Sequence, residues 1–100
     1  RNGDAANKVG SLGLALAARH AAVPFLVVAP ESTVDMTTAS GEDIAIEERG
    51  ADEVTSFRGV RSAPPGTRTL NPAFDVTPAS LITAIVTDRR VIRLDLGETL

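Results

Sequence analysis

The chain has 100 residues, a formal net charge of −3 and a pI of about 5.0. Its hydrophobic fraction of 43% indicates a folded chain, and its length allows at most one small domain. The chain is acidic and lacks the stripe of basic residues that nucleic-acid-binding proteins usually carry, so we expect no nucleic-acid partner. The chain has no cysteine, which excludes disulfides and thiolate metal sites. It also lacks the run of about 20 apolar residues that a membrane span needs.

The first predicted element is a helix over residues 6–20, which are rich in Ala and Leu. Apolar residues recur at helical spacing, at Val9, Leu12 and Leu16. Asp4 precedes this segment and is a candidate cap for its first turn. His20 lies in the last turn, where a cation favours the negative end of the helix dipole. We therefore interpret His20 as a dipole partner and not as a general base.

The apolar run from Phe25 to Ala29 predicts a buried strand, because its length and branching suit a strand better than a helix. Such strands occur in parallel sheets that are covered on both faces. A helix followed by a buried strand is half of a Rossmann-like repeat. We therefore predict the α/β class, with a mainly parallel sheet flanked by helices. Polar residues 31–35 follow the strand, at the edge where open α/β sheets bind ligands.

The remaining residues predict fewer regular elements. Residues 36–70 are mostly irregular, with a short strand at 44–46. The Pro- and Gly-containing residues 63–66 are predicted to interrupt any regular secondary structure. Thr77 and Pro78 are typical of a helix start. They predict a second helix that ends near Asp88, with an apolar face made of Leu81, Ile82, Ile85 and Val86. Residues 91–94 are predicted to pair as an edge strand.

The block from Asn2 to Lys8 has two interpretations. It can form a sugar-phosphate site at a helix amino terminus, where free N–H groups and the dipole attract an anion. In that site Lys8 supplies a charge and Asn7 supplies an amide. The alternative is a turn and cap with a solvated lysine, and spacing alone favours this alternative. The chain has neither a GxGxxG motif nor a P-loop, so a nucleotide site has little support.

The block from Asn71 to Pro78 is predicted to be a rigid turn. We expect Phe74 to fill the core and Asp75 to turn outward or cap, with backbone N–H groups as its partners if it is buried. Acidic residues 42–48 have no nearby His or Cys and are predicted to form a solvated face, not a metal site. Ser32 and Ser40 lack matching His and Asp partners, which argues against nucleophilic hydrolysis.

Six stretches of the chain together resemble the carboxy-terminal part of the methylthioribose-1-phosphate isomerase family. They are N-G-D-A-A-N-K-V-G, V-P-F-L-V-V-A-P, S-T-V-D, G-E-D-I-A-I-E-E-R, N-P-A-F-D-V-T-P and L-I-T-A-I-V-T-D. The first stretch is shared with ribose-1,5-bisphosphate isomerase and with regulatory subunits of a translation-initiation exchange factor. The segment 42–49 and the form N-P-A-F favour the methylthioribose-1-phosphate enzyme.

The resemblance implies an aldose–ketose isomerisation in methionine salvage, from methylthioribose-1-phosphate to methylthioribulose-1-phosphate, without a cofactor. Phosphate on the anomeric oxygen of this sugar blocks ordinary ring opening, so an acid must assist. The resemblance also implies a cytoplasmic homodimer acting on a small sugar phosphate. Two alternatives stay open: a non-catalytic regulatory subunit of the translation-initiation type, and a ribose-1,5-bisphosphate isomerase.

The resemblance maps the family's substrate-contacting pair onto Asn7 and Lys8. The family's catalytic cysteine and aspartate would lie upstream of Arg1, so no catalytic residue is expected in this chain. Residues 1–100 are therefore expected to be a partial C-terminal Rossmann-like domain of a longer enzyme, inactive alone. The chain departs from the family pattern at Ser11-Leu12 and at Asp88-Arg89-Arg90, neither of which is a mapped contact.

Overall fold

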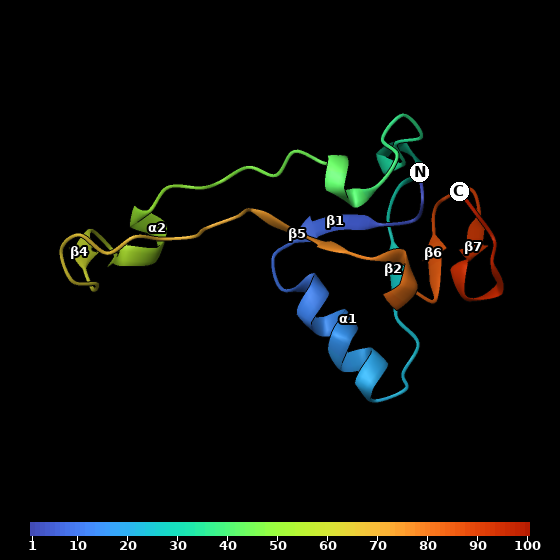
Figure 1. The fold of residues 1–100 in the computed structure, drawn as a ribbon, viewed down its shortest axis with the longest axis horizontal. Coiled ribbons are helices and arrows are strands. Elements are labelled where there is room, and N and C mark those ends of the chain that lie inside the picture. Colours follow the sequence, from blue (N-terminus) through green and yellow to red (C-terminus); the bar gives the residue numbers. More distant parts are fainter.

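The computed structural model describes all of residues 1–100 and has a mixed α/β composition (Figure 1). Four short 3-10 turns accompany two helices and seven strands. The helices and strands are β1 (Ala5–Lys8), α1 (Ser11–His20), β2 (Leu26–Val28), α2 (Asp52–Thr55), β3 (Ser56–Phe57), β4 (Val60–Arg61), β5 (Phe74–Thr77), β6 (Ala84–Val86) and β7 (Val91–Arg93). None of the helices is long and apolar enough to span a membrane.

The strands form three small sheets. The largest has the order β2-β6-β7, with β2 parallel to β6 and β7 antiparallel at the edge. β1 pairs with β5, and β3 pairs with β4, both antiparallel. The α/β class and the edge strand near residues 91–94 are confirmed. The prediction of a mainly parallel sheet is wrong, because three of the four strand pairs within residues 1–100 are antiparallel.

The predicted second helix over residues 77–88 is wrong. Its apolar spacing fits a helix and a short strand equally well, and long-range pairing decides between them. β6 pairs along its whole length with β2, and the Thr83 N–H donates to the Phe25 carbonyl 2.8 Å away. Only Ala79–Leu81 form a helical turn, of the 3-10 type. The strand expected at residues 44–46 is also absent.

The first helix starts later than predicted. Residues 5–8 are a strand because they pair with β5, which lies about 70 residues away in sequence. Gly10 then turns the chain into α1 with φ +110°, a value that favours glycine. Phe74, expected in the core, is 46% exposed.

The core lies on the β2-β6-β7 sheet. Its buried members are Ile82, Ile85 and Ile92, and Phe25 and Val27 pack against them. Only nine of the 100 residues are buried, and the radius of gyration of 16.5 Å exceeds the roughly 13 Å of a compact domain of this size. Large apolar surfaces on α1 and β2 are therefore uncovered within these residues.

An arm, defined as residues 47–73, projects from this body (Figure 1). Its two extended rails are joined at the base, where the Ala73 N–H donates to the Glu47 carbonyl and the Arg49 N–H donates to the Asn71 carbonyl, both at 2.8 Å. The tip carries α2 and the β3–β4 hairpin. The arm thus departs from the body beside the end of β1 that bears Lys8.

Gly41 is a point of close packing between the ribbon β1–β5 and the turn Gly41–Asp43. A Cβ atom at position 41 would overlap Cγ1 of Val76. We expect Gly41→Ala to lower the free energy of unfolding by about 1–3 kcal/mol, as overpacking does. Urea denaturation would measure the change. The double variant Gly41→Ala/Val76→Ala should recover part of the loss beyond additivity, and strict additivity would contradict this packing.

Candidate functional site

The ribbon β1–β5 carries both predicted substrate-binding residues. In its register Asn7 lies opposite Asp75, and Lys8 lies opposite Phe74. Asn7 lines a cavity of about 270 Å³ that reaches to β2 and Thr33. Lys8 is exposed and is not among the lining residues. The two residues are therefore adjacent on β1, and of the two only Asn7 lines this cavity.

Lys8 lies within electrostatic reach of the arm. The pKa of Glu53 is lowered first by hydrogen bonds from Arg49, then by Asn71, and also by the charge of Lys8. Arg49 holds this carboxylate through contacts of 2.6–3.0 Å. Glu53 is thereby neutralised by its own arm partner, and the Lys8 ammonium makes no salt bridge within residues 1–100.

The amino terminus of α1 is already occupied by a carboxylate. Asp75 accepts hydrogen bonds from the Gly10 N–H at 2.8 Å and from the Leu12 N–H at 3.2 Å. Of the two alternatives for Asp75, turned outward or capping, the structure shows capping, but of α1 and not of the helix that was expected to follow Asp75. The assignment of Asp4 as the cap of α1 is wrong. The interpretation of this helix start as an anion site loses two of its donors, because the Gly10 and Leu12 N–H groups already bind Asp75.

Asp4 instead joins three segments on the other side of the ribbon. Its carboxylate accepts hydrogen bonds from the N–H groups of Ala79 at 2.8 Å and Gly41 at 2.9 Å, and from the Asn2 amide at 2.9 Å. Burial alone would raise the pKa of Asp4, but these hydrogen bonds outweigh it and lower the pKa below 3.8. Asp4 is thus an ionised structural link near the site.

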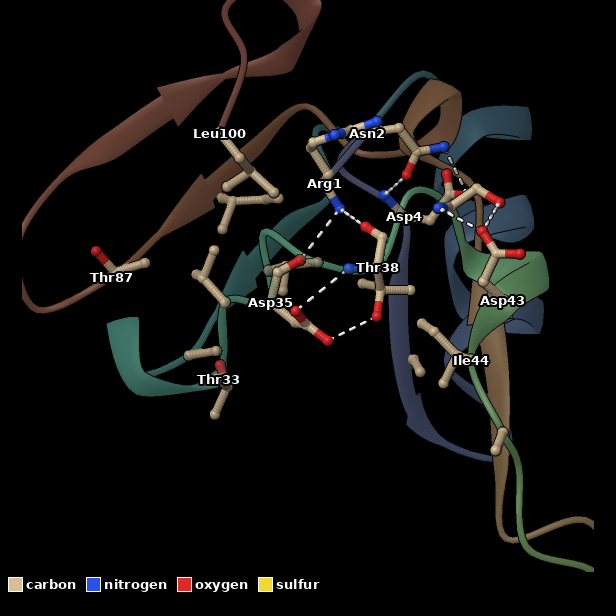
Figure 2. A pocket seen from close by; sticks show the side chains of 18 residues that line it. Arg1, Asn2, Asp4, Thr33, Asp35, Thr38, Asp43, Ile44, Thr87 and Leu100 are labelled. Carbon is tan, nitrogen blue, oxygen red and sulfur yellow. Dashed lines mark hydrogen bonds between the residues drawn. The ribbon is translucent and has the colours of Figure 1, made fainter.

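A larger cavity of about 440 Å³ opens at the carboxyl ends of β2 and β6, where sequence reasoning placed ligand-binding polar residues. Figure 2 shows the side chains of Asp35 and Thr38 turned toward each other in its wall. Hydrogen bonds from the Thr37 and Thr38 side chains, and from their N–H groups, hold the pKa of Asp35 far below its usual range. This carboxylate shapes its own turn, and its hydrogen-bonding capacity is used there.

The other candidates lie apart from this region or serve structure. His20 is exposed at the last residue of α1. Nowhere do three His, Asp or Glu side chains gather so that they could hold a metal ion. The Asp43 carboxylate accepts hydrogen bonds from Ser40 and closes the turn Gly41–Asp43.

Sequence reasoning missed the contacts of Asp4 and Asp75 with their actual partners. The partners of Asp4 lie 37 and 75 residues away, and those of Asp75 lie 63 and 65 residues away. Local spacing carries no signal for such pairs. The available hint was compositional, since each aspartate stands in a block that mixes polar and backbone-shaping residues.

A family model described as the Initiation factor 2 subunit family matches residues 1–93. The chain therefore belongs to this family.

Two curated relatives of the same name are similar to the chain. A methylthioribose-1-phosphate isomerase of Geobacillus kaustophilus is 57% identical over all 100 residues, and one of Anaeromyxobacter sp. is 60% identical over 92 residues. These matches cover 28% and 27% of the two relatives, so the chain spans about a quarter of their length.

Two solved structures are also similar to the chain. The 5-methylthioribose 1-phosphate isomerase of Pyrococcus horikoshii OT3 matches with a TM-score of 0.85 and 51% identity, covering 92% of this chain and 26% of that one. Subunit delta of the translation initiation factor eIF-2B from A. fulgidus matches with a TM-score of 0.83 and 36% identity, covering 90% of this chain and 26% of that one.

Proposed function

We propose that the protein to which residues 1–100 belong is an aldose–ketose isomerase that converts 5-methylthioribose-1-phosphate to 5-methylthioribulose-1-phosphate. The observation that carries this proposal is the 57% identity to a methylthioribose-1-phosphate isomerase over all 100 residues. The regulatory-subunit alternative has weaker support, since the eIF-2B structure shares 36% identity against 51% for the isomerase structure.

In this proposal residues 1–100 are the C-terminal part of a Rossmann-like domain. The exposed side chains of β2 support it, because Leu26 is 54% and Val28 is 76% exposed although both lie in an apolar strand. Helices packed on this face of the sheet would cover them, and further parallel strands beside β2 would extend the β2–β6 pair. The catalytic cysteine and aspartate would come from other parts of the protein, which would act as a cytoplasmic homodimer without a cofactor.

The two proposed substrate contacts differ in kind: Lys8 supplies a charge, and Asn7 supplies an amide. Lys8 would place an ammonium group beside the phosphate and favour its negative charge. Asn7 would offer one donor and one acceptor to the sugar hydroxyls from inside the cavity of β1 and β2. Ring opening and proton transfer would fall to the groups outside residues 1–100.

Replacing Lys8 by alanine in the full-length protein should weaken substrate binding by about 1–3 kcal/mol, the range for a lost charged hydrogen bond. Steady-state kinetics would show this as a higher KM or a lower kcat/KM. Lys8→Arg keeps the charge and should recover part of the loss. Arg68→Ala, which removes an exposed cation of the arm, is the matched control and should leave both constants unchanged. Unchanged constants for Lys8→Ala would refute its role.

The proposal itself is tested by offering the full-length protein methylthioribose-1-phosphate and ribose-1,5-bisphosphate separately. Turnover of the first alone is the expected result. Turnover of the second alone would identify the other isomerase, and turnover of neither would favour the regulatory subunit. Residues 1–100 alone should be inactive, and substantial turnover by them would contradict the placement of the catalytic groups elsewhere.

A further inference from the structure

Asp75 connects the three elements that surround the proposed sugar-phosphate site. It stands on β5, directly opposite Asn7 of β1. Its carboxylate leaves the ribbon and accepts hydrogen bonds from the Gly10 and Leu12 N–H groups at the start of α1. One side chain therefore ties the ribbon to the helix that follows Lys8.

The turn after Lys8 is held at several points. The Ser11 hydroxyl donates to the Lys8 carbonyl at 2.8 Å, and the Val9 N–H donates to the Ala73 carbonyl at 3.3 Å. Gly10 adopts φ +110°, so the turn follows a narrow path. Among these contacts the carboxylate of Asp75 is the charged one, and hydrogen bonds to charged groups are the stronger kind. Without this contact the turn after Lys8 would be less restrained, and the position of Lys8 at the end of β1 would vary more.

Asp75 also changes what an incoming phosphate meets. The start of a helix carries a partial positive charge and N–H groups that bind anions. In this protein the Asp75 carboxylate already fills that role for α1. A phosphate that approached the Gly10 and Leu12 N–H groups would have to displace a carboxylate, so the exposed Lys8 ammonium is the favoured partner.

We propose that Asp75 is a positioning residue of the sugar-phosphate site: it fixes the turn that carries Lys8 and keeps the substrate phosphate off the amino terminus of α1. This inference rests on the proposed isomerase function. It adds to that function a residue that touches no substrate atom and acts through Lys8 and the helix start.

The test is Asp75→Asn in the full-length protein, because asparagine has the same shape, keeps one accepting oxygen and removes the negative charge. We expect kcat to fall about tenfold or more, since small misplacements of a binding group have effects of this size. We also expect inhibition by inorganic phosphate to strengthen severalfold, because the helix start then accepts an anion. A residue with only a structural role would lower stability without changing the phosphate inhibition constant.

Two further variants keep the test decisive. Asp75→Ser also removes the charge, keeps a shorter uncharged acceptor, and replaces Asp75→Asn should the latter fail to fold. Asp43→Asn is the matched control, because Asp43 also accepts a backbone N–H, at 3.2 Å from Ser40, but closes a different turn. This control should leave phosphate inhibition unchanged.

The outcomes separate the two proposals. An active wild-type protein whose kcat, KM and phosphate inhibition constant are unchanged by Asp75→Asn would overturn the role of Asp75 and leave the isomerase function standing. A wild-type protein that turns over neither sugar phosphate would overturn the function. In that case calorimetric titration with inorganic phosphate still tests Asp75, and equal affinities of wild type and Asp75→Asn would overturn its role as well.

Discussion

Replacing Asp4 by alanine is expected to lower the free energy of unfolding by about 3 kcal/mol, because it removes the charged acceptor of hydrogen bonds that are each worth about 1.5–3 kcal/mol and do not add fully. The partners come from Ala79, Gly41 and Asn2, so one substitution releases three segments from the ribbon. Hydrogen exchange of the β1 and β5 amides in the full-length protein would report the loss locally. Asp52→Ala, which removes an exposed carboxylate of the arm, should leave that exchange unchanged.

The effect of Asp4 should also depend on pH. Its folded-state pKa is depressed below the ordinary value of 3.8, so its contribution to stability is fully present above that value. The contribution is lost as the pH falls through the folded-state pKa. The difference between wild type and Asp4→Asn should therefore be largest at neutral pH and shrink below about pH 4. A difference that grew on acidification would contradict the assignment.

Replacing Ile85 by alanine is expected to lower the free energy of unfolding by about 2–5 kcal/mol, the range for such core truncations. Ile85 is 6% exposed and lies on the central strand of the β2-β6-β7 sheet, against Ile82 and Ile92. Urea denaturation of the full-length protein would measure the change as a lower midpoint with an unchanged slope.

The matched control for Ile85 is Val91→Ala on the neighbouring strand β7. Val91 is 57% exposed, so its truncation should change stability by well under 1 kcal/mol within residues 1–100. Equal effects of the two variants would indicate that the core described by Ile82, Ile85 and Ile92 is not the one that holds this part of the protein together.

How much of this fold could be predicted depended on whether local or distant contacts decide each element. The helix over residues 11–20 and the strand around Val27 follow from local spacing and apolar run length, and both formed. Residues 6–8 and 84–86 are predicted as helix from local apolar spacing, which carries no signal for pairing with the distant strands β5 and β2. β6 is a strand because β2 and β7 pair with it on either side, and β1 is a strand because β5 pairs with it.

The candidate site was predictable in its residue types but not in its geometry. The residues Asn7 and Lys8 were singled out from their place in a polar block and from a family resemblance. The placement of Asn7 opposite Asp75 depends on the β1–β5 register, and the capping of α1 by Asp75 depends on a contact between distant parts of the chain. A carboxylate that caps a helix from 65 positions away leaves no trace in any local window of the sequence.

Because the base of the arm is closed by hydrogen bonds, the length of the arm can change without moving the rest of the molecule. Because the Glu47 and Ala73 backbones are bonded to each other, the segment between them behaves as a loop with fixed ends. Each doubling of the length of such a loop costs only about 0.6 kcal/mol of chain entropy. Insertions and deletions at the tip can therefore accumulate over evolution with little effect on the positions of Asn7, Lys8 and Asp75.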